Sequence, residues 1–417
     1  MQAVDQYFDR IIIGGGAAGF FAAVQCASMA PHLSIAILEK GNDVLSKVRI
    51  SGGGRCNVTH ACLDPDVLTT FYPRGNKELR GPFRTFNCED TIAWFESKGV
   101  KLKTEPDGRM FPTTDDSSTI IKCLYEEARQ KQVKILTATR VDSFSKKDSH
   151  FLLNTNKGQF SCEKLMVASG SSAAQWSTLS ALGHKIVPSV PSLFTFNIQD
   201  ARIDDLQGIS LECVEISCPE INHKTLAAQN GPLLITHWGM SGPAVLRLSA
   251  WGARIFHEKE YRFDISINWL YPMHRSQILE TILDYKHSNN SKQKILTHYP
   301  FRQIPVRLWK NLLTRALKLS AEKNWADLNK REMDIIVEVL CDSKVKVNGK
   351  STFKEEFVTA GGVDLGEMNL KKFESKIVPG LYIAGEALNI DAVTGGFNFQ
   401  AAWTGGYIAG ISMAEDL

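Results

Sequence analysis

The stretch IIIGGGAAGFFAAVQCASMAPHLSIAILE, residues 11–39, decides the fold of this chain. Its first three residues form an apolar run long enough for a buried strand. The run leads into a loop that matches G-x-G-x-x-G through Gly14, Gly16 and Gly19. Residues 20–29 then read as a helix, and residues 34–38 read as a second strand that ends at Glu39. This context, closed by an acidic residue, predicts a Rossmann-type dinucleotide-binding unit.

The physical properties of this unit favour particular ligands. Its glycines permit a tight turn, close approach of the backbone to a pyrophosphate, and close packing of helix on strand. The free N–H groups at the helix N-terminus then face the two phosphates along a favourable dipole. Glu39 is expected to accept hydrogen bonds from a ribose 2′-hydroxyl, which favours FAD or NAD over NADP. A membrane or signal segment is rejected, because glycines interrupt the apolar run and the leader MQAVDQYFDR lacks a positive n-region.

The composition is that of an ordinary enzyme. The 417 residues predict two or three domains. A net charge of +3, from 48 basic and 45 acidic side chains, argues against nucleic-acid binding through bulk charge. No other stretch is apolar for long enough to span a bilayer. The nine cysteines show no C-x-x-C pair and no zinc spacing, which predicts no metal site and a reduced, cytoplasmic setting.

A second glycine-rich loop, SGGGRCN, occupies residues 51–57. Such a loop can lay backbone N–H groups along a phosphate or a ring edge while Arg55 neutralises charge. A flexible surface turn is an equally supported alternative. Cys56 and Cys62 invite comparison with the cysteine pair of flavin disulfide reductases, but redox pairs are usually more tightly spaced. Two ordinary reduced thiols are therefore favoured, with thiol–disulfide chemistry as the alternative.

The middle of the chain changes character. Residues 164–168 form another apolar strand that enters Ser169-Gly170, a pattern typical of close cofactor approach. From about Pro191, short alternating runs such as RFDISIN and KVKVN indicate antiparallel β structure. Residues 273–287 and 306–340 are predicted to be helical, with apolar stripes that form core rather than a cofactor site.

Nucleotide-binding patterns return in the last sixty residues. FVTAGGVDLGEM starts at residue 357, GLYIAGE spans 380–386 and TGGFNFQAAW spans 394–403. The second ends in Gly385-Glu386, where the acid would hold ribityl hydroxyls. The third opens a helix whose N-terminus is expected against the pyrimidine edge of a flavin, where the reduced ring carries negative charge. A glycine-capped helix in plain packing is the alternative, but it does not explain three glycine-rich loops.

These motifs, taken with GRMFP at 108–112 and THWGMSGPAVL at 236–246, resemble the BaiN-like flavoproteins. Members are also described as NAD(P)/FAD-dependent oxidoreductases or aminoacetone oxidase family FAD-binding enzymes. The resemblance covers essentially the whole chain. It implies an α/β and α+β multidomain fold. A Rossmann-like FAD-binding domain of glutathione-reductase type (1–190 and 354–417) would be interrupted by a β-barrel insert (191–270 and 341–353) and a helical subdomain (271–340).

The resemblance also implies a cofactor site. The glycine loop would hold the pyrophosphate, Glu39 the adenosine ribose, and the backbone of Val141 the adenine. Residues 55–57 would line the flavin side, and the C-terminal motifs would flank the ribityl chain and the ring. The implied FAD-binding residues are Gly14, Gly16, Ala17, Ala18, Gly19, Glu39, Lys40, Arg55, Cys56, Asn57, Val141, Ser169, Gly170, Gly385, Glu386, Gly396, Phe397, Asn398 and Phe399.

The expected function is that of an FAD-dependent oxidoreductase, with hydride transfer between a small organic substrate and NAD(P)H or another acceptor. Only one complete G-x-G-x-x-G exists, so NAD(P)H would dock transiently over the flavin. His237 is the first side chain to test for proton transfer, although a structural histidine in a turn explains it equally well. Arg55 and Arg109 are candidate anion clamps.

The alternative function is that of a flavoprotein directed at RNA or another macromolecule, as in tRNA modification. The insert would then recognise the partner, with the basic residues at 302–331 as a local patch. A solvated helix face is the plainer interpretation of that patch. The expected partner is therefore a small-molecule substrate, without nucleic acid and without a membrane.

Overall fold

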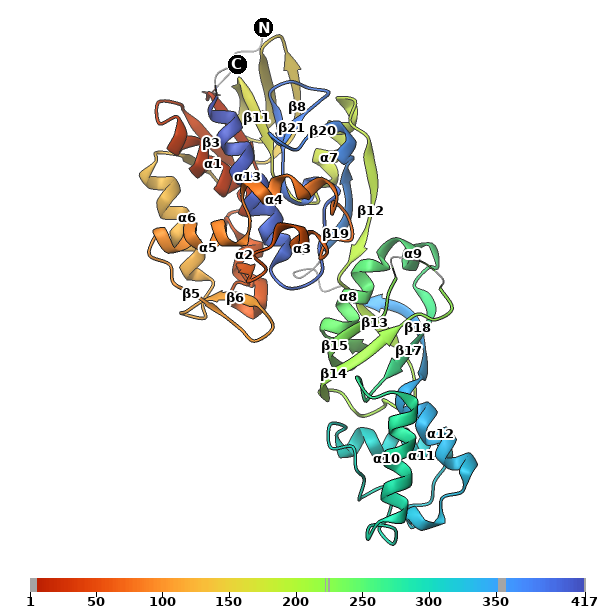
Figure 1. Ribbon diagram of the computed structural model, residues 1–417. Coiled ribbons are helices and arrows are strands. Elements are labelled where there is room, and N and C mark those ends of the chain that lie inside the picture. The colour runs from red at the N-terminus through yellow and green to blue at the C-terminus, as the bar shows by residue number, and fades with distance from the viewer. Residues whose placement is uncertain (1–5, 222, 224–225, 352–357, 416–417) are drawn as a thin grey trace. The chain divides into compact units, whose positions relative to one another are not determined.

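The computed structural model describes residues 6–221, 223, 226–351 and 358–415 (Figure 1). The chain divides into two compact units. The discontinuous unit contains residues 1–190 and 354–417, and the inserted unit contains residues 191–353. The predicted return to the FAD-binding domain at 353–354 lies outside the described residues. Each unit is described by itself below.

A seven-stranded sheet forms the centre of the discontinuous unit. Four adjacent strands in it are buried and pair in parallel with one another, which explains their continuous apolar runs. The Rossmann-like domain expected from residues 11–39 is therefore present. In spatial order the strands are β20 (Met368–Asn369), β21 (Glu374–Ser375), β22 (Leu381–Ile383), β11 (Lys164–Val167), β2 (Arg10–Ile13), β3 (Ile35–Leu38) and β7 (Lys134–Leu136).

Two long helices, α1 (Ala17–Met29) and α13 (Phe397–Ala414), pack along each other in this unit (Figure 1). Small residues make the close approach possible. A methyl group on Gly406 would lie 2.6 Å from the carbonyl oxygen of Ala18, and one on Gly410 would lie 2.6 Å from that of Ala22. The first and last long helices of the chain are thus joined over several turns.

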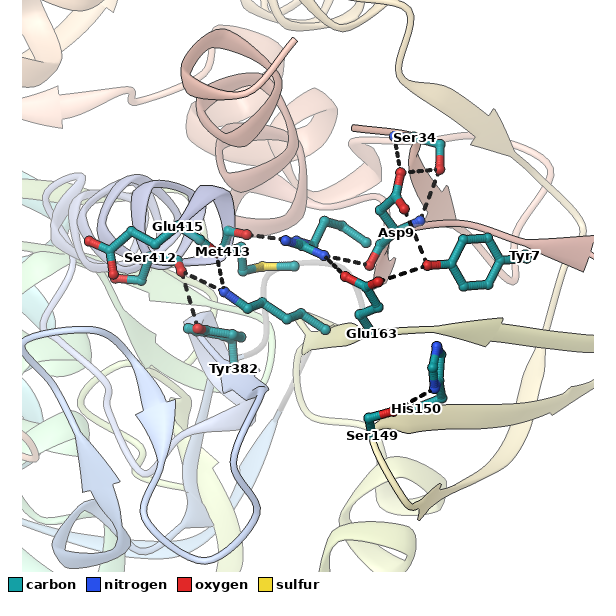
Figure 2. A network of polar contacts seen from close by, with 12 residues as sticks. Tyr7, Asp9, Ser34, Ser149, His150, Glu163, Tyr382, Ser412, Met413 and Glu415 are labelled. Carbon is teal, nitrogen blue, oxygen red and sulfur yellow. Dashed lines mark hydrogen bonds and ion pairs between the residues drawn. The ribbon is translucent and has the colours of Figure 1, made fainter. Parts of the chain in front are cut away.

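Buried cations fasten the C-terminal end of α13. Arg10 is 1% exposed and donates to the carbonyl of Met413 at 2.6 Å and to Glu163 at 2.8 Å. Lys164 is 2% exposed and donates to the carbonyls of Ser412 and Glu415. Figure 2 shows these accepting groups gathered at the helix end. Cations at this position satisfy orphan carbonyls and complement the negative end of the helix dipole.

Smaller elements complete the discontinuous unit. One sheet has the order β1-β10-β9-β8, a second has β4-β6-β5, and β12 pairs with β19. None of the described helices is long and apolar enough to cross a membrane. The remaining elements are β1 (Gln6–Tyr7), α2 (Ser46–Ile50), β4 (Thr59–His60), α3 (Pro65–Thr69), α4 (Pro82–Thr85), α5 (Cys88–Ser97), β5 (Leu102–Thr104), β6 (Arg109–Pro112), α6 (Ser118–Gln130), β8 (Val141–Lys147), β9 (His150–Thr155), β10 (Gly158–Cys162), α7 (Ala173–Ala181), β12 (Ile186–Ser192) and β19 (Val358–Val363).

The inserted unit contains a closed barrel of order β13-β16-β15-β14-β17-β18. One continuous hydrophobic cluster runs from the barrel strands into the helices. The elements are β13 (Thr195–Ile198), β14 (Ser210–Ser217), β15 (Gln229–Thr236), β16 (Gly239–Ser241), α8 (Pro243–Trp251), α9 (Ala253–Glu258), β17 (Arg262–Asn268), α10 (Arg275–His287), α11 (Val306–Leu317), α12 (Lys330–Cys341) and β18 (Ser343–Ser351).

The prediction of a helix throughout residues 306–340 is wrong in its middle. Helix α11 ends at Leu317, where Lys318 adopts a left-handed conformation with φ of 51°. Helix α12 starts after Asn329, whose side chain accepts from the N–H of Glu332 while the Glu332 side chain accepts from the N–H of Asn329. This capping box defines a new helix start inside an apolar pattern that is otherwise continuous.

Candidate cofactor site

The predicted glycine loop connects β2 to α1 and leaves open space on one side. Gly14 has φ of +111°, and a methyl group there would lie 2.5 Å from the carbonyl oxygen of Ala168 at the end of β11. This close contact requires glycine. A methyl group on Gly16 would meet no atom within 4 Å. Gly16 is also the N-cap of α1, and no side chain caps the helix there. The first N–H groups of α1 are therefore available to a ligand.

Glu39 follows β3, and its carboxylate is hydrogen-bonded to the backbone of the neighbouring loops. Its carboxylate accepts from the N–H of Gly15 at 2.8 Å and from that of Gly41 at 2.7 Å. Each oxygen keeps a second lone pair, so the predicted ribose contact of Glu39 and its neighbour Lys40 stays a prediction. The N–H of Thr139 donates to the Glu39 carbonyl at 2.8 Å, which brings the start of β8 beside β3.

Val141, the predicted adenine contact, begins β8. Its carbonyl accepts from the Gln175 side chain of α7 at 2.8 Å, which fixes the position of this backbone. Contact with adenine therefore stays a prediction.

The second glycine loop is structured rather than a flexible turn. Arg55 pairs with Glu105 at 2.7 Å and lies over the Phe111 ring at 4.0 Å. Arg109 pairs with Glu105 at 2.9 Å and with Asp107 at 2.7 Å. Because these carboxylates compensate both guanidinium charges, the geometry does not favour the predicted anion clamps.

The two cysteines near this loop differ from reactive thiols. Cys56 is fully buried, and burial raises the pKa of its thiol to about 12. Burial also raises the pKa of Cys62. Reactive cysteines have depressed pKa values, so the raised pKa values of both thiols favour the interpretation of ordinary reduced cysteines.

Asn57 joins the second loop to the start of α13. In the amide orientation that satisfies both groups, its oxygen accepts from the N–H of Gly396 at 2.9 Å and its nitrogen donates to the carbonyl of Thr59 at 3.1 Å. Gly396 has φ of +92°, and a methyl group there would lie 2.5 Å from the same Thr59 carbonyl. No side chain caps α13 at Gly396. The sequence therefore brings two uncapped helix starts into one unit, one at Gly16 and one at Gly396.

Side chains around the start of α13 hold it firmly. The Tyr72 hydroxyl donates to the carbonyl of Phe397 at 2.6 Å. Asn398 makes two hydrogen bonds to the backbone of Ala392, at 2.9 and 3.1 Å. The ring of Phe399 stacks on Trp403 with centroids 5.6 Å apart. These contacts fix the first turn of the helix, in which three predicted site residues lie.

An aromatic stack beside this turn was not predicted. The ring of Phe397 stacks on Phe71 with centroids 4.2 Å apart and on His60 with centroids 4.6 Å apart. His60 follows the second glycine loop by three residues, so its position after SGGGRCNVT is the one signal in the sequence. Contact with Phe397 depends on the fold and could not be read from spacing.

The ends of β11 and β22 place the remaining predicted residues together. Glu386 forms an ion pair with Lys47, a residue that sequence reasoning missed. A methyl group on Gly170 would lie 3.6 Å from the Glu386 carboxylate, and one on Gly385 would lie 3.4 Å from the Ala18 side chain. The Ser169 hydroxyl is buried without a hydrogen-bond partner among the described residues. Predicted residues from both ends of the sequence thus lie beside the start of α1.

One predicted loop is absent, and one predicted residue lies in the other unit. Gly361 and Gly362 belong to strand β19 rather than to a loop, and methyl groups there would lie 2.7 Å from the carbonyl of Pro188 and 2.6 Å from that of Ala387. They permit close backbone packing instead of ligand approach. His237 lies in the inserted unit, at the turn between β15 and β16. Its catalytic role stays a prediction.

A buried Ser–His–Glu cluster has the composition of a catalytic triad but not its access. His184 lies 3.1 Å from Glu367 and 2.9 Å from the Ser375 hydroxyl. That hydroxyl also accepts from the N–H groups of Ile377 and Val378, and Ser375 is 5% exposed. A nucleophile must reach its substrate, so this cluster is structural. Within the described residues, no group of three His, Cys, Asp or Glu side chains is placed to hold a metal ion.

The residues present fit a dinucleotide cofactor. The space beside Gly16 is open where a pyrophosphate would approach, and the N–H groups that start α1 and α13 lack side-chain caps. Uncapped helix starts of this kind are ready-made sites for anionic and electron-rich groups.

Comparisons with known proteins agree with this architecture. The model of the HI0933-like protein Rossmann domain family matches residues 8–412. The chain is 29% identical over 427 residues to a ribosomal RNA dihydrouridine synthase of Escherichia coli, covering 98% of each chain. It is 27% identical over 420 residues to a 3-dehydro-bile acid delta(4,6)-reductase of Clostridium scindens, covering 97% of this chain and 98% of that one.

A solved structure shares the fold. The 3-ketosteroid-delta4-(5alpha)-dehydrogenase of Rhodococcus jostii aligns with a TM-score of 0.53 at 13% identity, over 100% of this chain and 98% of that one. The family match and the enzymes among the relatives support the expected FAD-dependent oxidoreductase. They also confirm the resemblance seen in the motifs: the chain belongs to the HI0933-like Rossmann-domain family.

Proposed function

We propose that this protein is an FAD-dependent reductase that adds hydrogen across a carbon–carbon double bond conjugated to a carbonyl group. The observation that carries the proposal is the pair of packed helices, α1 and α13, that both begin at glycines without side-chain caps. One start suits the pyrophosphate of FAD, and the other suits the electron-rich edge of a reduced flavin.

The names of two relatives supply the substrate chemistry. A dihydrouridine synthase adds two hydrogens to a uracil ring, and a delta(4,6)-reductase acts on double bonds of a 3-keto steroid acid. In each substrate the double bond is conjugated to a carbonyl, so the carbon β to that carbonyl accepts hydride and the α carbon accepts a proton. Bound FAD, once reduced by the electron donor, would supply the hydride.

The side chains of this protein would hold and orient the reactants. The loop at Gly16 would bind the pyrophosphate, and Glu39 would bind the adenosine ribose. The side-chain oxygen of Asn57 accepts a hydrogen bond from the N–H of Gly396 at 2.9 Å and thereby orients the start of α13. His237 remains one candidate to deliver the proton. His60 is the second, because it stacks on Phe397 at that helix start.

The electron donor would be NAD(P)H, which would dock transiently because the sequence holds one complete G-x-G-x-x-G. A cytoplasmic setting would supply this donor.

The test is anaerobic titration of the purified, FAD-loaded protein with NADH, NADPH and a dithiol in parallel. Flavin bleached by a nicotinamide and reoxidised by a conjugated enone, with the saturated product detected, supports the proposal. A protein that takes up no flavin on reconstitution contradicts it. Reduction by the dithiol alone would instead support thiol–disulfide chemistry.

A further inference from the structure

The near-neutral net charge conceals a strongly basic segment in the inserted unit. Residues 285–321 contain no aspartate or glutamate and eight lysines and arginines, while the whole chain carries a net charge of only +3. The rest of the chain is therefore net negative. Positive charge is concentrated in the part of the inserted unit that contains α11. The eight residues are Lys286, Lys292, Lys294, Arg302, Arg307, Lys310, Arg315 and Lys318.

Packing determines which way α11 presents its charges. One face of the helix buries Leu308, Trp309, Leu312 and Leu313 in the hydrophobic cluster. Arg307, Lys310 and Arg315 are exposed on the remaining surface, as are Arg302 before the helix and Lys318 after it. Arg307 and Lys310 are one turn apart, and Arg315 lies about 12 Å from Arg307 along the axis. At about 100° per residue, Lys310 and Arg315 lie on opposite sides of Arg307 around the helix, so the cations cover its exposed half. We call this set of five cations the α11 basic row.

The helix is also held rigidly. Arg307 donates to the carbonyl of Asp205, and Asn311 donates to that of Asp204 at 3.0 Å. The indole N–H of Trp309 donates to the carbonyl of Ile295 at 2.9 Å. Several cations on the exposed half of a fixed helix are pre-organised for a partner that carries several negative charges.

We propose that the α11 basic row binds the phosphate backbone of RNA, so that the substrate carbonyl belongs to a base within an RNA chain. The inference rests on the proposed function for the reaction itself. Charge complementarity favours a polyanion over a small neutral substrate. A membrane surface fits less well, because an interfacial helix needs an exposed apolar face and the apolar face of α11 is buried.

A second feature of the same unit suits a nucleic acid. Residues 204–208 contact α11 through Asp204 and Asp205, and Gly208 donates to the carbonyl of Ile235 in β15 at 2.9 Å. The adjoining β15–β16 turn carries Trp238, which is 44% exposed. A cavity of about 390 Å³ lies there, lined by residues 207–208 and 234–238. An exposed indole beside such a cavity is a surface on which an unpaired base can stack.

The experiment measures binding of the FAD-loaded protein to a fluorescein-labelled RNA stem–loop with uridines in the loop, by anisotropy at several salt concentrations. The test variant combines Arg302→Glu, Lys310→Glu and Arg315→Glu, whose side chains make no hydrogen bond or ion pair with the described residues. The matched control combines Lys101→Glu, Arg129→Glu and Lys134→Glu, which are exposed in the discontinuous unit.

The test variant should bind RNA at least tenfold more weakly, and the slope of log affinity against log salt should fall by about 2, since three phosphate contacts are lost. Trp238→Ala should weaken binding about fivefold without changing this slope. The control triple should bind like the wild type. All variants should keep their flavin absorbance and reduce a small enone at the wild-type rate.

Three results would overturn the proposal: no RNA binding by the wild type, equal losses in the test and control variants, or preference for phosphatidylglycerol vesicles over RNA. Failure of the proposed function gives a different result. The wild type would then bind RNA through the α11 basic row while holding no FAD or reducing no conjugated double bond.

Discussion

Two helices of the inserted unit and two of the discontinuous unit begin in opposite ways. In the inserted unit, α10 starts with a capping box between His274 and Gln277, and α12 starts with one between Asn329 and Glu332. In the discontinuous unit, α1 and α13 start at Gly16 and Gly396, which have no side chain to cap the N–H groups of the first turn. The capping boxes satisfy the N-termini of α10 and α12 within the chain, as another capping box does for α5 in the discontinuous unit. Helices that are left open cost stability until a ligand satisfies them.

The largest effect should come from closing one open start. Gly16 has φ of −94° and ψ of −169°, which valine adopts readily, and its side chain would extend into empty space. Gly16→Val should therefore fold but lose essentially all FAD, because it fills the approach of the pyrophosphate. Gly16→Ala should lose less.

Absorbance at 450 nm and far-UV circular dichroism check this. Gly81→Ala is the matched control, because a methyl group on Gly81 also meets no atom within 4 Å. Full FAD occupancy in Gly16→Val would show that the open start does not bind the cofactor.

The next effect tests the far end of α13. Arg10→Met leaves the Met413 carbonyl and Glu163 without their buried donor. Because the Met413 carbonyl stays in the interior without its donor, the free energy of unfolding should fall by about 2 kcal/mol. Urea unfolding of the FAD-free protein measures this. Arg80→Met, which removes an exposed pair with Asp66, should change little. Equal effects of the two variants would mean that the end of α13 is not fastened as described.

The buried Ser–His–Glu cluster around His184 should make the free energy of unfolding depend on pH. Burial lowers the pKa of His184 below its ordinary value, although its hydrogen bond with Glu367 opposes the shift. The folded protein therefore binds fewer protons than the unfolded chain below about pH 6.5. The contribution of neutral His184 to the free energy of unfolding is fully present above that pH. It is lost as the pH falls through the pKa of His184 in the folded protein.

Urea unfolding between pH 5 and 8 should show the loss at low pH, with a contribution of at most about 1.4 kcal/mol per pH unit. The comparison variant is His184→Gln. It removes the titrating imidazole and keeps the neighbouring ion pair between Lys185 and Asp364. That variant should have a flatter profile. An identical profile would place the titrating group elsewhere.

The smallest effect should come from a capped helix. Asn329→Ala removes the side chain that accepts from Glu332, so the free energy of unfolding should fall by about 1 kcal/mol. FAD content should not change, because this cap serves the fold alone. Chemical unfolding monitored alongside flavin absorbance separates the two. Loss of FAD in this variant would mean that the Asn329 cap also supports the cofactor site.

Some of these features were predictable from short stretches of sequence. The loop at Gly14–Gly19 could be placed because strand, turn and helix follow one another directly. The link between Asn57 and Gly396 could not, because it joins segments that only the fold brings together. The glycines at 361–362 suggested a loop, since close packing of a strand and a flexible turn both require glycine. The break before Asn329 was missed because the apolar pattern dominates a single capping box.

The fastening of α13 by Arg10 also has a consequence for biosynthesis. The two residues of the Arg10–Met413 hydrogen bond are separated by 403 positions in the chain. A ribosome therefore makes the entire inserted unit before the helix that completes the discontinuous unit can emerge. Domains tend to fold as they are synthesised, so the inserted unit can fold first. During that time β2 and α1 have been synthesised but lack α13, on which α1 packs. FAD capture would then occur only after α13 has left the ribosome.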